Sequence, residues 1–206
     1  KELLTAFFEQ HNYSYRFVAI PIKRFNKWYV EKGIDFKFPD NSYWNSDRRK
    51  DLSIHYSDPV IDYIDGLMVL PENIGKGIGN LKNIGMVSGF TPWPYMDDIN
   101  AGKISVTENF VVTGVLKQVM GQRIDGAYIN ISVANYQLSE TLKRQGGLVF
   151  DPDLPYIKST YLFSSIKYPK VIEEFNQFLK SHKEQIDDLK DRYGVNISDQ
   201  LDMPPK

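Results

Sequence analysis

The sequence contains no cysteine, which excludes disulfide bonds, thiolate metal ligands and a cysteine nucleophile. Its three histidines, His11, His55 and His182, do not have the spacing of a histidine zinc site. We therefore expect neither a metal nor another cofactor. The absence of cysteine also fits an oxidising compartment, because disulfides are optional there.

Long hydrophobic runs and an excess of charge are missing as well. No apolar run approaches the roughly 20 residues that a transmembrane helix needs. The formal net charge of −1 argues against nucleic-acid binding, which normally uses a basic face. With 42% hydrophobic and 25% charged residues the composition is that of an ordinary globular protein, and 206 residues allow one large domain or two small ones.

A helix that ends at a glycine and leads through Ile-Asp into a short apolar run occurs twice. The first copy is a predicted helix over Arg24–Lys32 followed by Gly33–Pro39, and the second is a helix over Glu108–Met120 followed by Gly121–Asn130. An apolar run after such a helix stop is typical of a buried parallel strand. Two copies predict two similar α/β lobes with mostly parallel sheets, and a cleft between the lobes in which a ligand would bind.

The chain starts inside a predicted helix. Leu3, Leu4, Phe7 and Phe8 fall on one helical face, and no Ser, Asp or Asn cap precedes them. A natural protein rarely begins in this way. We therefore expect an upstream segment that comprises a signal peptide and a first strand.

Two further segments are predicted from their periodicity. Tyr13–Ile20 alternates as a strand does. Pro169–Tyr193 has an apolar stripe at helical spacing and is predicted to be the longest helix, with Gly194 as its C-terminal stop. Its apolar stripe indicates core packing, and its charged face indicates contact with solvent.

Four short motifs follow one another along the chain. They are Pro21-Ile22-Lys23-Arg24, Ile54-His55-Tyr56-Ser57-Asp58-Pro59, Ile84-Gly85-Met86-Val87-Ser88-Gly89-Phe90-Thr91, and Gly121-Gln122-Arg123-Ile124-Asp125-Gly126-Ala127. Their order and spacing resemble those of the bacterial extracellular solute-binding proteins of family 3 type, the type II periplasmic binding proteins that serve polar amino-acid ABC transporters. The resemblance spans nearly the whole chain and lacks only the first strand.

This resemblance implies the two-lobed α/β fold of the type II periplasmic binding proteins. Lobe 1 would comprise residues 1–70 and 154–206, and lobe 2 residues 71–153. Two crossovers, near Asp65–Leu70 and Phe150–Pro155, would form a hinge that lets the lobes close around a ligand. The resemblance further implies a monomer, periplasmic or lipid-anchored outside the cytoplasm, whose partner is the membrane permease of an ABC transporter.

The resemblance also implies an arginine that holds the ligand's α-carboxylate, because a guanidinium group matches a carboxylate with two hydrogen bonds. Ser46-Asp47-Arg48-Arg49 has the Ser/Thr-to-Arg spacing of that motif, which favours Arg49. The stretch from there to Ser57 is one residue longer than the usual pattern, so Arg48 stays open as the anchor. The alternative is that both arginines lie on the surface.

Asn130 stands where amino-acid binders carry an aspartate for the ligand's ammonium group. An amide is a weaker partner for a cation than a carboxylate is. The resemblance with this departure therefore implies a weaker demand for a free α-amine. The alternative is an asparagine at a strand end that satisfies backbone groups.

The remaining candidates lie in a turn and among aromatic residues. Ser88-Gly89-Phe90-Thr91 precedes a predicted helix, so its backbone N–H groups either accept an anion or form a plain capped turn. Aromatic residues such as Trp93 and Tyr95 either wall the cleft or pack in the core. Because turns at the carboxyl ends of parallel strands gather at one crevice, we predict that the cleft is lined by Asn41, Tyr43, Trp44 and Arg49 from lobe 1 and by Ser88, Phe90, Thr91 and Asn130 from lobe 2.

These expectations combine into one function. The chain would bind a small polar solute that bears a carboxylate and deliver it to an ABC importer. The alternatives are a ligand-sensing periplasmic domain of a membrane receptor and a cleft enzyme on the same fold. No cluster of Glu, His or Ser with catalytic spacing is visible, so we expect no enzymatic activity.

Overall fold

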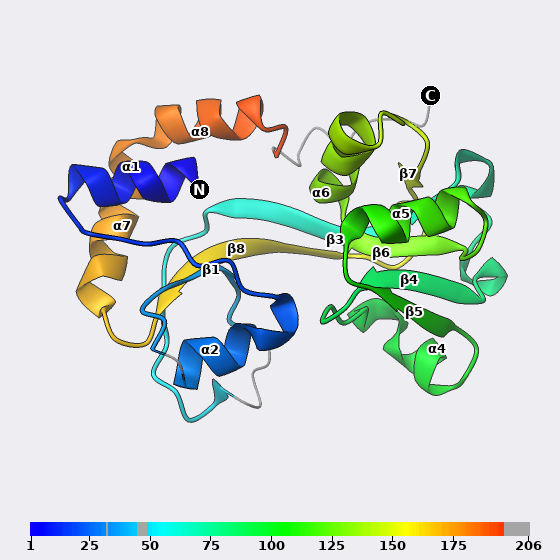
Figure 1. Ribbon diagram of the computed structural model, residues 1–206, viewed down its shortest axis with the longest axis horizontal. Coiled ribbons are helices and arrows are strands. Elements are labelled where there is room, and N and C mark those ends of the chain that lie inside the picture. Colours follow the sequence, from blue (N-terminus) through cyan, green and yellow to red (C-terminus); the bar gives the residue numbers. More distant parts are fainter. Residues whose placement is uncertain (32, 45–48, 196–206) are drawn as a thin grey trace. The chain divides into compact units, whose positions relative to one another are not determined.

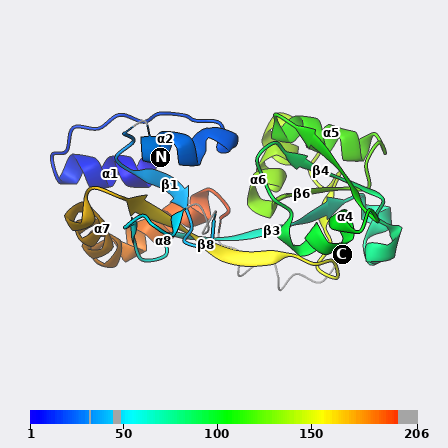
Figure 2. The same ribbon diagram turned by 90° about the horizontal axis from the view of Figure 1, so that it is seen from below.

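The computed structural model describes residues 1–31, 33–44 and 49–195 of the chain. Within these ranges, unit 1 comprises Lys1–Asp62 with the segment from Thr160 onward, and unit 2 comprises Tyr63–Ser159. The chain enters unit 2 within strand β3 (Ile61–Val69) and returns within strand β8 (Ile157–Ser165), as Figures 1 and 2 show. The sequence predicts crossings near Asp65–Leu70 and Phe150–Pro155, whereas the unit boundaries fall at Asp62/Tyr63 in β3 and at Ser159/Thr160 in β8. None of the helices in the described ranges is both long and apolar enough to cross a membrane.

Unit 1 combines helices with a small antiparallel sheet. Strands β1 (Lys37–Asp40) and β2 (His55–Tyr56) both pair antiparallel with β8. These pairs differ from the mostly parallel sheets that the sequence predicts, because both short strands pair with the returning strand. Helices with bounds within the described residues include α1 (Glu2–Gln10), η1 (Ile22–Arg24), α2 (Phe25–Glu31), α7 (Pro169–Ser181) and α8 (Lys183–Arg192).

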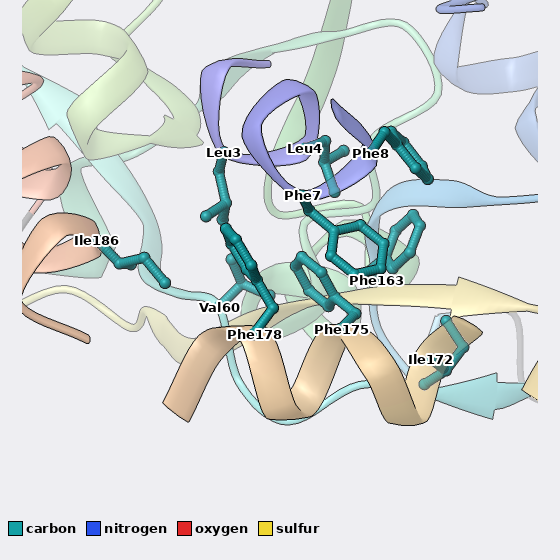
Figure 3. Packing of buried hydrophobic residues seen from close by; sticks show 10 residues of the cluster. All are labelled: Leu3, Leu4, Phe7, Phe8, Val60, Phe163, Ile172, Phe175, Phe178 and Ile186. Atoms are coloured by element: carbon teal, nitrogen blue, oxygen red, sulfur yellow. The ribbon is translucent and has the colours of Figure 1, made fainter. Parts of the chain in front are cut away.

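The core of unit 1 is largely aromatic, and the predicted apolar face of α1 is buried in it. The ring centroid of Phe7 on α1 lies 5.0 Å from that of Phe175 on α7, and Phe175 lies 4.9 Å from Phe163 on β8. Figure 3 shows these rings meeting between α1, α7 and β8. Because each ring buries a large apolar area, the cluster holds these three elements together. Its buried members are Leu3, Leu4, Phe7, Phe8, Val60, Phe163, Ile172, Phe175, Phe178 and Ile186.

The predicted single helix over Pro169–Tyr193 is in fact two helices, α7 and α8, with a break at His182. The backbone of His182 leaves helical geometry there (φ −115°, ψ 26°). The carbonyl oxygen of Phe178 accepts hydrogen bonds from the Ser181 hydroxyl at 3.2 Å and from Nδ1 of His182 at 3.1 Å. The N–H of His182 also donates to this oxygen at 3.0 Å, so backbone and side-chain bonds together close the last turn of α7 before α8 begins.

Tyr13–Ile20 is not a strand, contrary to the prediction, since none of its residues is assigned to one. Its aromatic side chains contact helices instead. The Tyr15 ring stacks on Phe8 of α1 at 5.1 Å, and the Tyr13 hydroxyl donates to the Glu174 carboxylate of α7 at 2.5 Å. Tyr13 and Tyr15 therefore pack on helices rather than in a sheet, and most of the segment is exposed.

Unit 2 contains a mixed sheet. Strand β4 (Asn83–Val87) pairs parallel with β5 (Ser105–Asn109) and with β6 (Gly126–Asn130), whereas β6 and β7 (Val149–Phe150) pair antiparallel with β3. The predicted helix from Glu108 begins later, because residues up to Asn109 continue β5 in register with β4. The helical segments are η2 (Pro71–Asn73), η3 (Ile78–Asn80), η4 (Trp93–Tyr95), α4 (Met96–Asn100), α5 (Val112–Met120), α6 (Ile131–Tyr136) and the π-helix η5 (Gln137–Thr141).

Both faces of the unit 2 sheet are covered, with α5 on one side and α4 on the other in Figure 1. A Cβ atom on Gly85 would lie 2.8 Å from Cγ1 of Val115 on α5, so this position faces α5 and leaves no room for a side chain. The adjacent Ile84 points to the opposite face and shares a buried cluster with Tyr95 and Tyr128. The face that carries Tyr128 is therefore the one covered by η4 and α4.

Phe175→Ala is expected to lower the free energy of unfolding by about 3–5 kcal/mol, because it empties a fully buried aromatic position. Phe110→Ala is the matched control, since the Phe110 side chain is 88% exposed and its loss should change stability by less than about 0.5 kcal/mol. Urea unfolding curves measure both effects. A loss of similar size in the two variants would contradict the described core.

Candidate functional site

A buried carboxylate, Asp40, lies at the end of β1 and binds two cations. The residue has no solvent exposure. Arg49 donates to it in a two-pronged pair, with Nη2 at 3.0 Å from Oδ2 and Nη1 at 3.1 Å from Oδ1. Nζ of Lys37 donates to Oδ1 at 2.7 Å. These distances are those of strong charge-assisted hydrogen bonds.

An irregularity in β1 brings Lys37 and Asp40 together. In a regular strand, residues three positions apart point to opposite faces. The pairing of β1 with β8 changes register between Lys37, which is opposite Ser164, and Asp40, which is opposite Leu162. The Ser164 hydroxyl also donates to Oδ2 of Asp40 at 2.6 Å. The carboxylate is therefore bound to β8 as well as to the two cations.

Lys37, Asp40 and Arg49 together are called the charge cluster below, and when all three are ionised they carry one positive charge in excess. Aromatic rings enclose it: Nζ of Lys37 lies 5.5 Å from the ring centroid of Phe25 and 5.6 Å from that of Trp44. Burial lowers the pKa of Lys37, and the attraction of Asp40 acts in the opposite sense. The cluster thus keeps a positive charge away from water at a cost in free energy.

Arg49 is 5% exposed, so it is not a surface arginine, and Arg48 lies outside the described residues. Nη1 of Arg49 also donates to the carbonyl oxygen of Asn41 at 3.4 Å and to the Tyr56 hydroxyl at 3.3 Å. Nε has no hydrogen-bond partner in the described part of the chain. The guanidinium nitrogens that the sequence assigns to a ligand carboxylate therefore bind Asp40, and Nε is the donor left over.

The other three residues predicted in lobe 1 flank this cluster or face solvent. Asn41 is 3% exposed, and its side chain bonds to two backbone groups. Nδ2 donates to the carbonyl oxygen of Thr160 and Oδ1 accepts from the N–H of Tyr43, both at 2.9 Å. Trp44 is half-buried beside Lys37 and lies edge-on to Tyr161. Tyr43 is 82% exposed. The structure thus brings Asn41, Trp44 and Arg49 together and leaves the Tyr43 ring in solvent.

In unit 2, the turn predicted to accept an anion follows β4. The N–H of Ser88 donates to the carbonyl oxygen of Asn109 at 2.8 Å, and its hydroxyl donates to Glu108 at 2.6 Å. Gly89 has a φ of 104°, which favours glycine there. Phe90 and Thr91 are half-buried, and the turn leads into the short η4 and α4 rather than into a long helix. The role of this turn toward an anion stays a prediction.

Of the two aromatic residues in η4, Tyr95 packs in the core. It has no solvent exposure, and its hydroxyl donates to the carbonyl oxygen of Pro155 at 2.9 Å. Trp93 is 59% exposed. The packing alternative therefore holds for Tyr95, whereas the Trp93 ring is open to solvent.

Asn130 closes β6 and caps α6. Its Oδ1 accepts a hydrogen bond from the N–H of Val133 at 3.0 Å, so it satisfies a backbone group at a strand end, as the alternative interpretation predicts. Its side chain also makes a hydrogen bond with Asp65. Asp65 on β3 is the residue directly opposite Asn130 in the antiparallel register, which places both side chains on one face.

Asp65 is the residue of this region that the sequence reasoning missed. It is 9% exposed, and its Oδ1 has no hydrogen-bond partner in the described part of the chain. Burial raises the pKa of Asp65 to about 7, while the hydrogen bond from Asn130 acts to lower it. The signal was available, because Asp65 interrupts the apolar run over Tyr63–Leu70.

A cavity elsewhere in unit 2 is lined by Asp125 and Asp151, among others. Both carboxylates accept hydrogen bonds from backbone N–H groups. Oδ2 of Asp125 accepts from the N–H groups of Lys82 at 2.6 Å and Asn83 at 2.7 Å. Oδ2 of Asp151 accepts from the N–H of Gly75 at 2.9 Å. Across residues 1–31, 33–44 and 49–195, no cluster of three or more His, Asp or Glu side chains has the arrangement of a metal site.

Asp40→Asn is expected to destabilise the protein by about 3–5 kcal/mol, because it leaves two buried cations without a counter-ion. Asp35→Asn is the control, since it removes only the half-exposed ion pair with Lys167, worth at most about 1 kcal/mol. Urea unfolding of the two variants gives the comparison. Equal losses would contradict the strength assigned to the charge cluster.

The raised pKa of Asp65 predicts a pH-dependent stability. Its carboxyl group keeps a proton up to about pH 7 in the folded protein but only up to about pH 3.9 in the unfolded chain. The folded state therefore holds more protons between these values, and the free energy of unfolding falls as the pH rises through them. Asp65→Asn removes this term, so the variant should be more stable than the wild type at pH 8, by at most about 4 kcal/mol, with the difference shrinking toward pH 4.

Asp62→Asn is the control for this effect, because Asp62 lies on the same strand but is exposed. It should keep the wild-type pH dependence. Thermal or urea unfolding between pH 4 and 8 measures all three proteins. Parallel stability profiles for the wild type and Asp65→Asn would show that Asp65 titrates normally.

Comparison with proteins of known structure identifies the fold. No protein-family model and no curated protein matches the sequence. The ligand-binding core of GluR0, solved with L-glutamate, matches with a TM-score of 0.72 and 16% identity over 93% of this chain and 87% of that one. The amino acid ABC transporter substrate-binding protein AbpA from Streptococcus pneumoniae, bound to L-arginine, matches with 0.71 and 15% over 94% and 82%.

An ancestral arginine-binding protein bound to arginine also matches, with a TM-score of 0.71 and 16% identity over 93% of this chain and 85% of that one. At such identities the likeness shows the fold. The chain has the two-lobed α/β fold of the periplasmic binding proteins, as the sequence resemblance predicts, and substrate-binding proteins of amino acid ABC transporters share it.

Proposed function

We propose that the protein is an extracytoplasmic solute-binding protein that holds a small polar solute through an anionic group, most simply a carboxylate. It presents this solute to the membrane permease of an ABC importer and acts as a monomer without enzymatic activity. The shared fold supports the proposal, because AbpA and the ancestral arginine-binding protein have it and each binds an amino acid.

The charge cluster is the observation that carries the anionic part of the proposal. Lys37 and Arg49 are both buried, and Asp40 balances one of their two charges. A buried charge without a partner is costly. A ligand carboxylate beside the cluster would neutralise the excess charge and take up Nε of Arg49, the donor without a partner in the described residues.

The other predicted residues complete the proposed site. In unit 1, Asn41 and Trp44 lie next to the cluster, and Tyr43 offers an exposed ring for stacking on a ligand. We further propose ligand contacts at the strand ends of unit 2, from Ser88, Phe90, Thr91 and Asn130. We also propose that the two units close around the solute, with β3 and β8 as the hinge.

A sensory domain is the second candidate function, and the likeness to the GluR0 ligand-binding core favours it. Both functions require the same ligand site, so binding data alone do not separate them. The gene downstream of Lys206 does: an encoded transmembrane segment would favour a receptor, and a stop codon a free binding protein.

The proposal is tested by a thermal-shift screen over amino acids, polyamines, small peptides and organic acids. A compound that binds only the folded state raises the apparent stability in proportion to its occupancy. We expect a shift from compounds that carry a carboxylate. The absence of a shift from every compound with an anionic group would overturn the proposal.

Lys37→Met tests the charge cluster once such a compound is known. The variant keeps the neutral Asp40–Arg49 pair and should fold, but it loses the excess positive charge. Affinity for the anionic ligand should fall about 30-fold or more, as for other buried charge pairs. Calorimetric titration measures the change.

Lys167→Met is the matched control, because this lysine is half-exposed and pairs with Asp35 on the surface. It should bind the ligand as the wild type does. Arg49→Lys tests Arg49 separately, since it keeps the charge and loses the two-pronged geometry. Unchanged affinity in Lys37→Met and Arg49→Lys would remove the charge cluster from the ligand site.

A further inference from the structure

We propose that Asp65 binds a positively charged group of the ligand, an ammonium or a guanidinium. This inference rests on the proposed function and narrows it, because the solute then carries a cationic group as well as its anionic one. It also revises the expectation drawn from Asn130. The amide at position 130 implies a weaker demand for an amine, whereas Asp65 supplies a carboxylate directly across from it.

Three polar groups share this corner of unit 2. Asp65 is opposite Asn130, and Leu67 is opposite Tyr128, so the side chains of Asp65, Tyr128 and Asn130 lie on one face of the β3–β6 pair. The hydroxyl of Tyr128 and Oδ1 of Asp65 are both buried without a hydrogen-bond partner in the described part of the chain. Buried polar atoms are nearly always satisfied in folded proteins, so two orphans on one face indicate a missing partner.

The missing partner of Asp65 is a cation. Among the described residues no lysine, arginine or histidine forms an ion pair with Asp65, in contrast to Asp40. The titratable groups of this corner are phenols, since the groups that act on Tyr128 are Asp65, Tyr95 and Tyr63. Burial and then the charge of Asp65 raise the pKa of Tyr128, which therefore stays a neutral hydroxyl. A ligand ammonium is the group that would offset the cost of ionising Asp65.

A purely structural role would not require a carboxylate at position 65. The hydrogen bond between Asp65 and Asn130 joins β3 to β6, and an asparagine at position 65 could make the same bond. The asparagine would avoid the cost of burying an ionisable group. Strand pairing therefore does not explain why residue 65 is an ionisable carboxylate.

Binding of a cation at Asp65 has a measurable consequence for protons. Near pH 7 a fraction of Asp65 carries a proton in the free protein. A ligand cation favours the ionised carboxylate, so the proton leaves Asp65 for the buffer as the ligand binds. Release of at most about half a proton per ligand is expected at pH 7, and a structural hydrogen bond would not cause it.

The experiment compares each protein amino acid that shifts the melting temperature with its deaminated acid, as L-aspartate with succinate or L-glutamate with glutarate. The proteins are the wild type, Asp65→Asn, the exposed-site control Asp62→Asn, and the swap Asp65→Asn/Asn130→Asp. The swap returns a carboxylate to the same opposed pair of positions. Titration calorimetry at pH 7 in two buffers of different ionisation enthalpy gives both affinity and proton release.

We expect the wild type and Asp62→Asn to bind the amino acid about 30-fold or more tightly than the deaminated acid, and Asp65→Asn to lose this preference and the proton release. The swap should recover the preference. Asp65→Asn that keeps its affinity for the amino acid within about threefold, or loses both probes equally, would overturn the inference. If the deaminated acids bind the wild type as tightly as the amino acids, Asp65 is excluded and the proposed function stands; if neither class binds, the proposed function itself fails.

Discussion

The buried carboxylate of Asp40 is the interaction on which the arrangement of unit 1 depends. Lys37, Arg49 and Ser164 reach it from different parts of the chain. Removing a carboxylate from water costs several kcal/mol, and only good geometry with all of these donors recovers that cost. Strand β1, its neighbour β8 and the segment at Arg49 must therefore keep their relative positions. The aromatic core between α1, α7 and β8 supplies most of the apolar burial, but it does not specify position in this way.

Two buried aspartates differ in how their negative charge is balanced. Asp40 has two cations and leaves one positive charge in excess, whereas Asp65 has no cation among the described residues. Buried charges without a partner cost stability, and perturbed ionisable groups of this kind cluster at functional sites. By the proposals above, an anionic group of the solute would offset the excess charge in unit 1, and a cationic group would offset Asp65 in unit 2. This match between the charges of the solute and of the protein supports the proposal independently of the likeness of the fold.

Much of the fold follows from local patterns. The repeated unit of helix, glycine and apolar run predicts two α/β lobes, and the apolar face of α1 is buried as expected. The failures have a common cause. Tyr13–Ile20 alternates without having a strand beside it, and the stripe over Pro169–Tyr193 continues across the break at His182. Periodicity along the chain does not report which other segments pack beside it or where the backbone leaves helical geometry.

The candidate site separates what the sequence by itself determined from what only the tertiary structure decided. The spacing of Ser46–Arg49 favoured Arg49 and left Arg48 open, and the position of Asn130 after Asp125 marked the end of β6, because both rest on short-range order along the chain. The partner of Arg49 and the role of Asp65 needed the folded chain. Asp40 meets Arg49 through a register shift against β8, and Asp65 meets Asn130 across the β3–β6 pair. Register between strands distant in sequence is set by hydrogen bonds and burial in three dimensions, and no local pattern encodes it.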